Sequence, residues 1–156
     1  MASYQAAGIS RPQHMQAFGN ASIYDDSVTI TANLTTADTV DLIRIPAGTR
    51  VTGIKFFSGD LDTSTTLTAN IGWRSVSGAA ITVAGSSAAA NATAFGSALT
   101  MFQAASSVTS SPELGFAPVT FNDDVYLTLI PAVNGTGLSG TPAIVTIVDG
   151  VNVGVK

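Results

Sequence analysis

The chain has 156 residues, of which 46% are hydrophobic and only 10% are charged, and its formal net charge is −4. This length suits one domain with a single hydrophobic core. The six Lys and Arg residues are scattered along the sequence, which argues against direct binding of DNA or RNA. Cysteine is absent, so disulfides and thiolate metal sites are excluded.

Hydroxyl side chains supply much of the polarity, because the sequence holds 20 Thr and 16 Ser. Thr suits the half-exposed surface of a β-sheet. A low fraction of charged residues also suits a surface that partners cover, since charges are depleted in the centres of interfaces. No run of about 18 apolar residues occurs, so we expect no membrane span. The first 18 residues lack the apolar core of a signal peptide.

Residues 1–24 show neither helical nor strand periodicity, and we predict that they form an extended arm. The rest of the chain, residues 25–156, is then a single β-sandwich domain. Isolated apolar residues in the arm are candidate anchors on neighbouring subunits: Tyr4, Ile9, Met15, Phe18 and Tyr24. The alternative is that the arm folds back on its own domain.

Two strands follow the arm. Residues 27–32 alternate apolar and polar side chains, whereas residues 40–45 are apolar on both faces, so both faces of the second strand are expected to be covered. Residues 46–49, Pro-Ala-Gly-Thr, predict a turn. In residues 50–57 the apolar parity changes around Gly53, which predicts a β-bulge there.

The next strand has one apolar face, formed by Leu67, Ala69, Ile71 and Trp73, opposite short and mostly polar residues. This pattern predicts a half-buried antiparallel strand. An exposed Trp can serve as a stacking platform for sugars. Because Trp73 continues the apolar face of its strand, packing in the core or in an interface is the favoured interpretation.

Residues 75–112 contain no charged side chain. Ile81 and Val83 fit a short strand. Phe95, Leu99 and Phe102 have the i, i+4, i+7 spacing of a helical face, so we expect a short helix or an ordered loop here. These three residues either cap one end of the sandwich or form a contact surface, and we count them as interface candidates.

Residues 125–129 and 143–148 give the closing strands, with a Gly-rich loop between them. The sequence therefore predicts an all-β fold, namely an antiparallel β-sandwich or jelly roll of seven to eight strands with an extended N-terminal arm.

Groups for catalysis are scarce, since the chain has one histidine, His14, in the predicted arm, and no cysteine. We therefore expect no enzyme and no cofactor. Asp60 and Asp62, followed by Thr63 and Ser64, are weak candidates for a calcium site. Asp beside Gly and Ser or Thr is also ordinary turn chemistry, which we favour, so no metal site is predicted.

Three segments carry a resemblance: Ile-Pro-Ala-Gly-Thr-Arg-Val (45–51), Asp-Leu-Asp-Thr-Ser-Thr-Thr-Leu-Thr-x-x-Ile-Gly (60–72) and Asn-Asp-Asp-Val-Tyr-Leu-Thr-Leu (122–129). In this order the chain resembles small virion proteins of tailed bacteriophages, specifically capsid decoration or cement proteins, over residues 38–73 and 121–149. The resemblance implies a β-sandwich without catalytic residues that binds the outside of an assembled shell.

The functional hypothesis is a virion structural protein at the capsid surface, made in the host cytoplasm, whose partners are the major capsid protein and copies of itself. It would stabilise the shell by bridging neighbouring subunits. The alternative is a tail-borne or surface adhesion module that binds a glycan or a host receptor.

Overall fold

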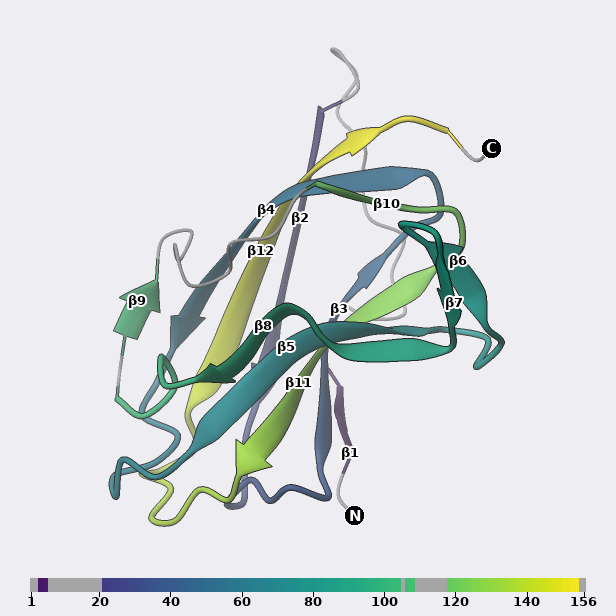
Figure 1. The fold of residues 1–156 in the computed structure, drawn as a ribbon. Coiled ribbons are helices and arrows are strands. Elements are labelled where there is room, and N and C mark those ends of the chain that lie inside the picture. Colours follow the sequence, from purple (N-terminus) through teal and green to yellow (C-terminus); the bar gives the residue numbers. More distant parts are fainter. Residues whose placement is uncertain (1–2, 6–20, 105, 109–117, 155–156) are drawn as a thin grey trace.

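The computed structural model describes residues 3–5, 21–104, 106–108 and 118–154. These residues form twelve β-strands and no helix, and the strands are arranged mainly in two facing sheets (Figure 1). The predicted all-β sandwich is confirmed. The strand count is higher than predicted because five of the twelve strands are only three residues long, too short for a pattern of alternation.

The first sheet has five strands. In spatial order they are β1 (Ser3–Gln5), β3 (Thr39–Ile45), β11 (Val125–Val133), β5 (Thr68–Ser75) and β8 (Ala90–Leu99). All neighbours pair antiparallel except β1 and β3, which are parallel.

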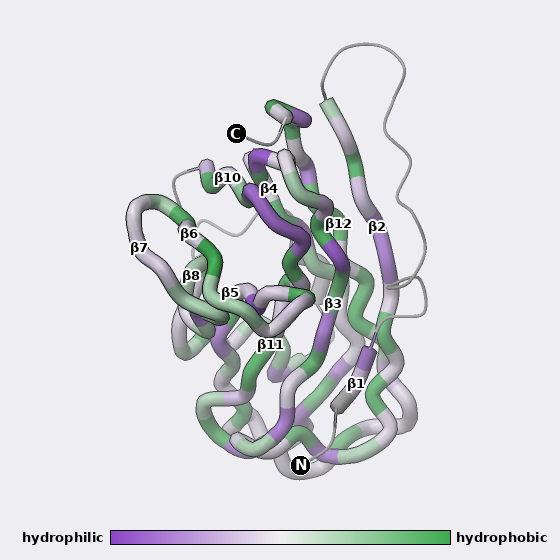
Figure 2. The backbone as a smooth tube through the Cα atoms, turned by 90° about the vertical axis from the view of Figure 1, so that its right-hand side faces the viewer, coloured by the Kyte–Doolittle hydropathy of each residue, from purple (hydrophilic) through white to green (hydrophobic). Residues whose placement is uncertain are grey.

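The second sheet also has five strands, two of which pair with different parts of the same strand. Its path is β10 (Val119–Phe121), β4 (Thr49–Ser58), β12 (Ala143–Asn152) and β2 (Ala21–Thr29), and β9 (Ser106–Val108) also pairs with β4. A separate hairpin consists of β6 (Ile81–Val83) and β7 (Ser86–Ala88). Figure 2 shows this hairpin and β2 on opposite sides of the molecule.

The predicted turn between β3 and β4 is present. The Thr49 amide donates to the Pro46 carbonyl oxygen at 3.3 Å, and Gly48 has φ of 79°. A side chain is strained at such a φ, so the turn uses glycine.

The predicted bulge in β4 is also present. Gly53 pairs with Asp149 and Val51 pairs with Gly150, which leaves Thr52 unpaired in the register between β4 and β12. This extra residue lets both Val51 and Ile54 face the core.

The expected helix or loop around residues 95–102 is wrong for most of its length, because residues 90–99 form β8. The strand is irregular between Phe95 and Leu99, because its register against β5 shifts between Gly96 and Leu99 and Ala98 has a positive φ of 51°. Both Phe95 and Leu99 are buried, and Phe102 is buried in the turn that follows.

The apolar face of β5 lies in the core, as predicted. Leu67, Ala69 and Ile71 are fully buried, and Trp73 is 3% exposed. The Trp73 ring meets Phe121 edge to face at 5.8 Å between centroids. Trp73 therefore packs in the core.

Gly72 marks a close approach between β5 and β8. A Cβ added at Gly72 would lie 2.0 Å from the carbonyl oxygen of Asn91 and 2.5 Å from the carbonyl carbon of Ala92. The register between these strands shifts twice over this stretch, so the β8 backbone lies against the β5 glycine. Only glycine fits this position.

The strand β2 begins at Ala21, within the range that we assigned to the arm. Tyr24 is fully buried, and its hydroxyl lies 3.2 Å from the Thr49 hydroxyl. None of the described residues forms a helix long and apolar enough to cross a membrane.

Candidate functional site

A buried carboxylate organises the outer surface of the first sheet. Asp41 on β3 is fully buried although it points away from the second sheet. Arg74 on β5 binds it with two parallel hydrogen bonds, Nε to Oδ1 at 2.7 Å and Nη2 to Oδ2 at 2.5 Å. Such a two-pronged contact fixes both side chains in one geometry.

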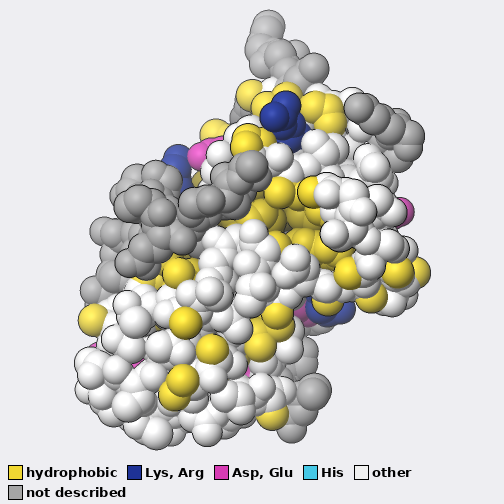
Figure 3. Space-filling model, in the orientation of Figure 1, with side chains coloured by type: hydrophobic (Ala, Val, Ile, Leu, Met, Phe, Trp, Pro, Cys, Tyr) yellow, Lys and Arg dark blue, Asp and Glu magenta, His cyan; other side chains and the backbone are white. Residues whose placement is uncertain are grey.

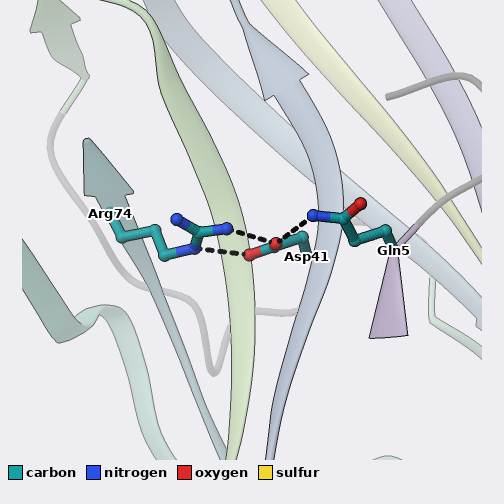
Figure 4. Close-up of polar contacts among 3 residues, drawn as sticks. All are labelled: Gln5, Asp41 and Arg74. Atoms are coloured by element: carbon teal, nitrogen blue, oxygen red, sulfur yellow. Dashed lines mark hydrogen bonds and ion pairs between the residues drawn. The ribbon is translucent and has the colours of Figure 1, made fainter. Parts of the chain in front are cut away.

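Two further side chains, those of Tyr126 and Gln5, complete this arrangement, and Figure 4 shows Gln5 together with Asp41 and Arg74. The Arg74 guanidinium lies over the ring of Tyr126 on β11, 4.5 Å from its centroid, and the pKa of Arg74 is raised by its hydrogen bond to Asp41. Gln5 on β1 donates from Nε2 to Asp41 Oδ2 at 3.3 Å. We call these four residues the Asp41 cluster. It joins the N-terminal strand to the body of the sheet.

A second ion pair secures the turn after β3. Arg44 pairs with Asp124, whose other oxygen accepts a hydrogen bond from the Ala47 amide at 2.7 Å. Burial raises the pKa of Asp124, but the hydrogen bonds from Arg44 and Ala47 outweigh this effect and lower the pKa overall. Asp124 therefore ties the turn to the start of β11.

Asp62 organises the loops at one end of the sandwich. Its Oδ1 accepts from the Ser64 amide and hydroxyl and from the Thr136 amide, while Oδ2 accepts from the amides of Thr66 and Leu67 and the Thr66 hydroxyl. Burial raises its pKa, but these hydrogen bonds prevail and lower the pKa well below the usual range of Asp.

The neighbouring Asp60 accepts from the Asp62 amide at 2.9 Å. This is the turn chemistry that the sequence favours over a metal site. Within the described ranges, no group of three or more His, Asp or Glu side chains is placed to hold a metal ion.

A hollow lies between the β6–β7 hairpin and β10, with a volume of about 470 Å³. Figure 3 shows hydrophobic side chains on its floor. Val119 and Val153 line it, as does Arg50. Of the four basic side chains in the described ranges, Arg50 alone has no ion pair. Arg50 is also the one titratable group among the residues that line the hollow, so this lining contains no acid–base pair.

A second surface with unburied apolar groups is the outer face of β2, β12 and β4. Val145 on β12 pairs directly with Phe57 on the adjacent β4, and the two residues are 36% and 38% exposed. Ile23 on β2 is 58% exposed. The charged pair Lys55–Asp149, with a distance of 3.0 Å, lies between them. This mixture of apolar groups and one ion pair suits a contact surface.

The predicted interface residues lie in different environments. Tyr4 is half-buried against the core, while Tyr24, Phe95, Leu99 and Phe102 are core residues. Three others lie outside the described residues: Ile9, Met15 and Phe18. Contact of any of these residues with another subunit stays a prediction.

Sequence reasoning missed the Asp41 cluster and the exposed face of Phe57 and Val145. An acidic residue inside an apolar run, as Asp41 is, signals a buried ion pair, and Arg74 is the matching odd residue in β5. Their pairing depends on the strand order β3-β11-β5, which the pattern of one strand does not contain.

Among solved structures, two phage capsids contain chains that are similar to this one. No protein-family model and no curated protein matches the chain. A chain in the capsid asymmetric unit of cyanophage Pam1 is 28% identical, aligned over 91% of both chains with a TM-score of 0.56. A chain in the capsid of Ralstonia phage GP4 is 19% identical, aligned over 97% of this chain and 98% of that one with a TM-score of 0.67.

The described residues thus define an all-β sandwich protein. In particular, the chain is similar to chains of two phage capsids, which confirms the resemblance to tailed-phage virion proteins inferred from the sequence. The GP4 chain supports the fold alone, whereas the Pam1 chain is similar in sequence as well. The similarity to the Pam1 chain supports a structural role in a virion.

Proposed function

We propose that the chain is a non-enzymatic virion protein that binds the outer surface of a phage capsid and stabilises the shell by bridging neighbouring subunits. Its partners are the major capsid protein and further copies of itself. The observation that carries this proposal is the similarity to the chain of the Pam1 capsid, at 28% identity over 91% of both chains. An alignment of this extent covers the whole domain rather than a single turn motif.

The exposed surfaces favour such a role. The apolar side chains of Ile23, Phe57 and Val145 lie on one sheet face and supply area that another protein can bury. A protein that binds the assembled shell and not its free subunits stabilises the shell by mass action. Many modest contacts over a lattice then add through multivalency.

Among the described residues, neither the hollow around Arg50 nor the smaller one beside Asp123 and Asp124 is lined by a histidine, and Asp124 is engaged by Arg44 and the Ala47 amide. This favours a protein without catalysis. The alternative, an adhesion module, loses the sugar platform suggested for it, because Trp73 is buried between the sheets.

The number of copies per particle tests the proposal. Virions of the phage that encodes the chain would be purified and their proteins quantified by mass spectrometry against the major capsid protein. A shell-binding protein is expected on the order of hundreds of copies. A few copies per particle would contradict the proposal and favour the adhesion module.

Deletion of residues 1–20 tests the role of the arm. We expect lower occupancy on the capsid and release of DNA at a lower temperature, because the truncated chain loses contacts with adjacent subunits. Unchanged occupancy together with unchanged DNA release would contradict bridging by the arm.

A further inference from the structure

The N-terminal strand β1 is held at the edge of the first sheet by few contacts. It has three residues and pairs only with β3, with Ser3 opposite Thr39, Tyr4 opposite Val40 and Gln5 opposite Asp41. Tyr4 is half-buried against the core. The Gln5 side chain donates a hydrogen bond to Asp41 at 3.3 Å.

The acceptor for this strand belongs to the body of the domain. Asp41 lies on β3, Arg74 on β5 and Tyr126 on β11, and the bonds among these three residues do not involve β1. The carboxylate is oriented by the guanidinium, and Oδ2 faces the sheet edge where the Gln5 amide binds (Figure 4). The geometry of the acceptor is therefore independent of which chain supplies the strand.

The covalent connection between β1 and the rest of the chain is long. Fifteen residues, 6–20, separate Gln5 from β2. A fully extended segment of this length spans roughly 50 Å, so the same strand has the reach to dock on an adjacent copy. Docking in the same chain and docking on a neighbour make identical contacts, and they differ only in the cost of closing the connection and in the local concentration of copies.

We infer that the edge of β3 is a strand-acceptor site for the segment Ser3–Gln5 of a second copy of this chain. The second copy fits because it carries the required sequence: an aromatic residue opposite Val40, followed at once by an amide donor opposite Asp41. Exchange of the strand links adjacent copies through the buried carboxylate. The inference rests on the proposed function for the lattice that brings copies close together.

The absence of cysteine allows a direct test. Directly paired residues of adjacent strands lie within the Cα distance that a disulfide spans. Two full-length variants, Ser3→Cys and Thr39→Cys, would each be purified reduced, mixed at high concentration and oxidised. We expect a disulfide-linked heterodimer, identified by mass spectrometry, at least about tenfold more abundant than with the partner variant Ser87→Cys, which places a thiol on an exposed part of β7.

The double variant Ser3→Cys/Thr39→Cys checks the register. Exchange predicts that it closes within one chain when dilute and increasingly between chains as its concentration rises. Adding Gln5→Ala to Ser3→Cys should lower the heterodimer yield, because the donor to Asp41 is lost. The inference is overturned if the mixture yields no more heterodimer than the Ser87→Cys control, or if the double variant closes within one chain at every concentration.

These measurements use the isolated chain, so their failure is distinguishable from failure of the proposed function. A chain that shows no strand exchange and still occupies the capsid in many copies would refute this inference alone. A chain that exchanges strands and is absent from capsids would refute the proposed function alone.

Discussion

The substitution Asp41→Asn removes the charge at the centre of the Asp41 cluster. The carboxylate side chain is 1% exposed and accepts two hydrogen bonds from Arg74 and one from Gln5. Removing one partner of a buried ion pair costs about 3–5 kcal/mol, because the other charge is left without a partner. The Arg74 side chain is 35% exposed, so water offsets part of this cost. We expect a loss of about 3 kcal/mol in the free energy of unfolding.

Urea denaturation at neutral pH, followed by tryptophan fluorescence, measures this loss, since Trp73 is the one tryptophan and lies in the core. For a chain of this length, the expected loss corresponds to a decrease of roughly 6–12 °C in the melting temperature. A double-mutant cycle with Arg74→Met isolates the pair. The second substitution should cost much less in the Asp41→Asn background than in the original chain.

Asp149→Asn is the matched control. Asp149 and Lys55 form an ion pair at 3.0 Å in which both side chains are about one-third exposed. Pairs of this kind contribute at most about 1 kcal/mol. If Asp41→Asn costs no more than Asp149→Asn, the reasoning that assigns a structural role to the Asp41 cluster is refuted.

Three further predictions concern other parts of the molecule. Asp62→Asn should lower the free energy of unfolding by about 2–4 kcal/mol, since one carboxylate oxygen and the charge are lost. Because the pKa of Asp62 is lowered in the folded chain, its contribution to stability is present above the unfolded pKa of about 4 and decreases as the pH falls. Urea unfolding at pH 7 and pH 3 should therefore show a smaller loss of stability on acidification for the variant than for the original chain. Gly72→Ala should destabilise by several kcal/mol in the same assay, because the new methyl group overlaps the Asn91 carbonyl, and a change below about 1 kcal/mol would count against the close approach. Phe57→Asp should reduce binding to capsids that lack the chain, measured by co-sedimentation, whereas Ser87→Asp on the exposed part of β7, away from this face, should not; equal binding by both variants would exclude this face as the contact surface.

Local patterns predicted most of the sandwich. The alternation in β5, the Pro-Ala-Gly-Thr turn and the bulge beside Gly53 are each encoded within a few neighbouring residues. The error at residues 95–102 has a simple origin. A spacing of four is typical of a helical face, and the irregular register of β8 against β5 buries the same two residues, Phe95 and Leu99, in a strand.

The features that the sequence could not predict depend on contacts between distant segments. Asp41 and Arg74 are 33 positions apart and meet across β11, so their pairing requires the strand order of the sheet. The strand β1 is too short for any periodic pattern, and its position follows from the β3 edge that it joins. The exposed pair Phe57 and Val145 likewise depends on the register of β4 against β12.

The central claim is that many copies of this chain bind the outer surface of a phage capsid. Cryo-electron microscopy of intact virions, at a resolution that separates the strands of a sheet, tests it most directly. The account predicts density for this β-sandwich at regular positions on the outside of the shell, in contact with the major capsid protein. Density for the sandwich only at the tail, or none on the outer surface, would contradict it.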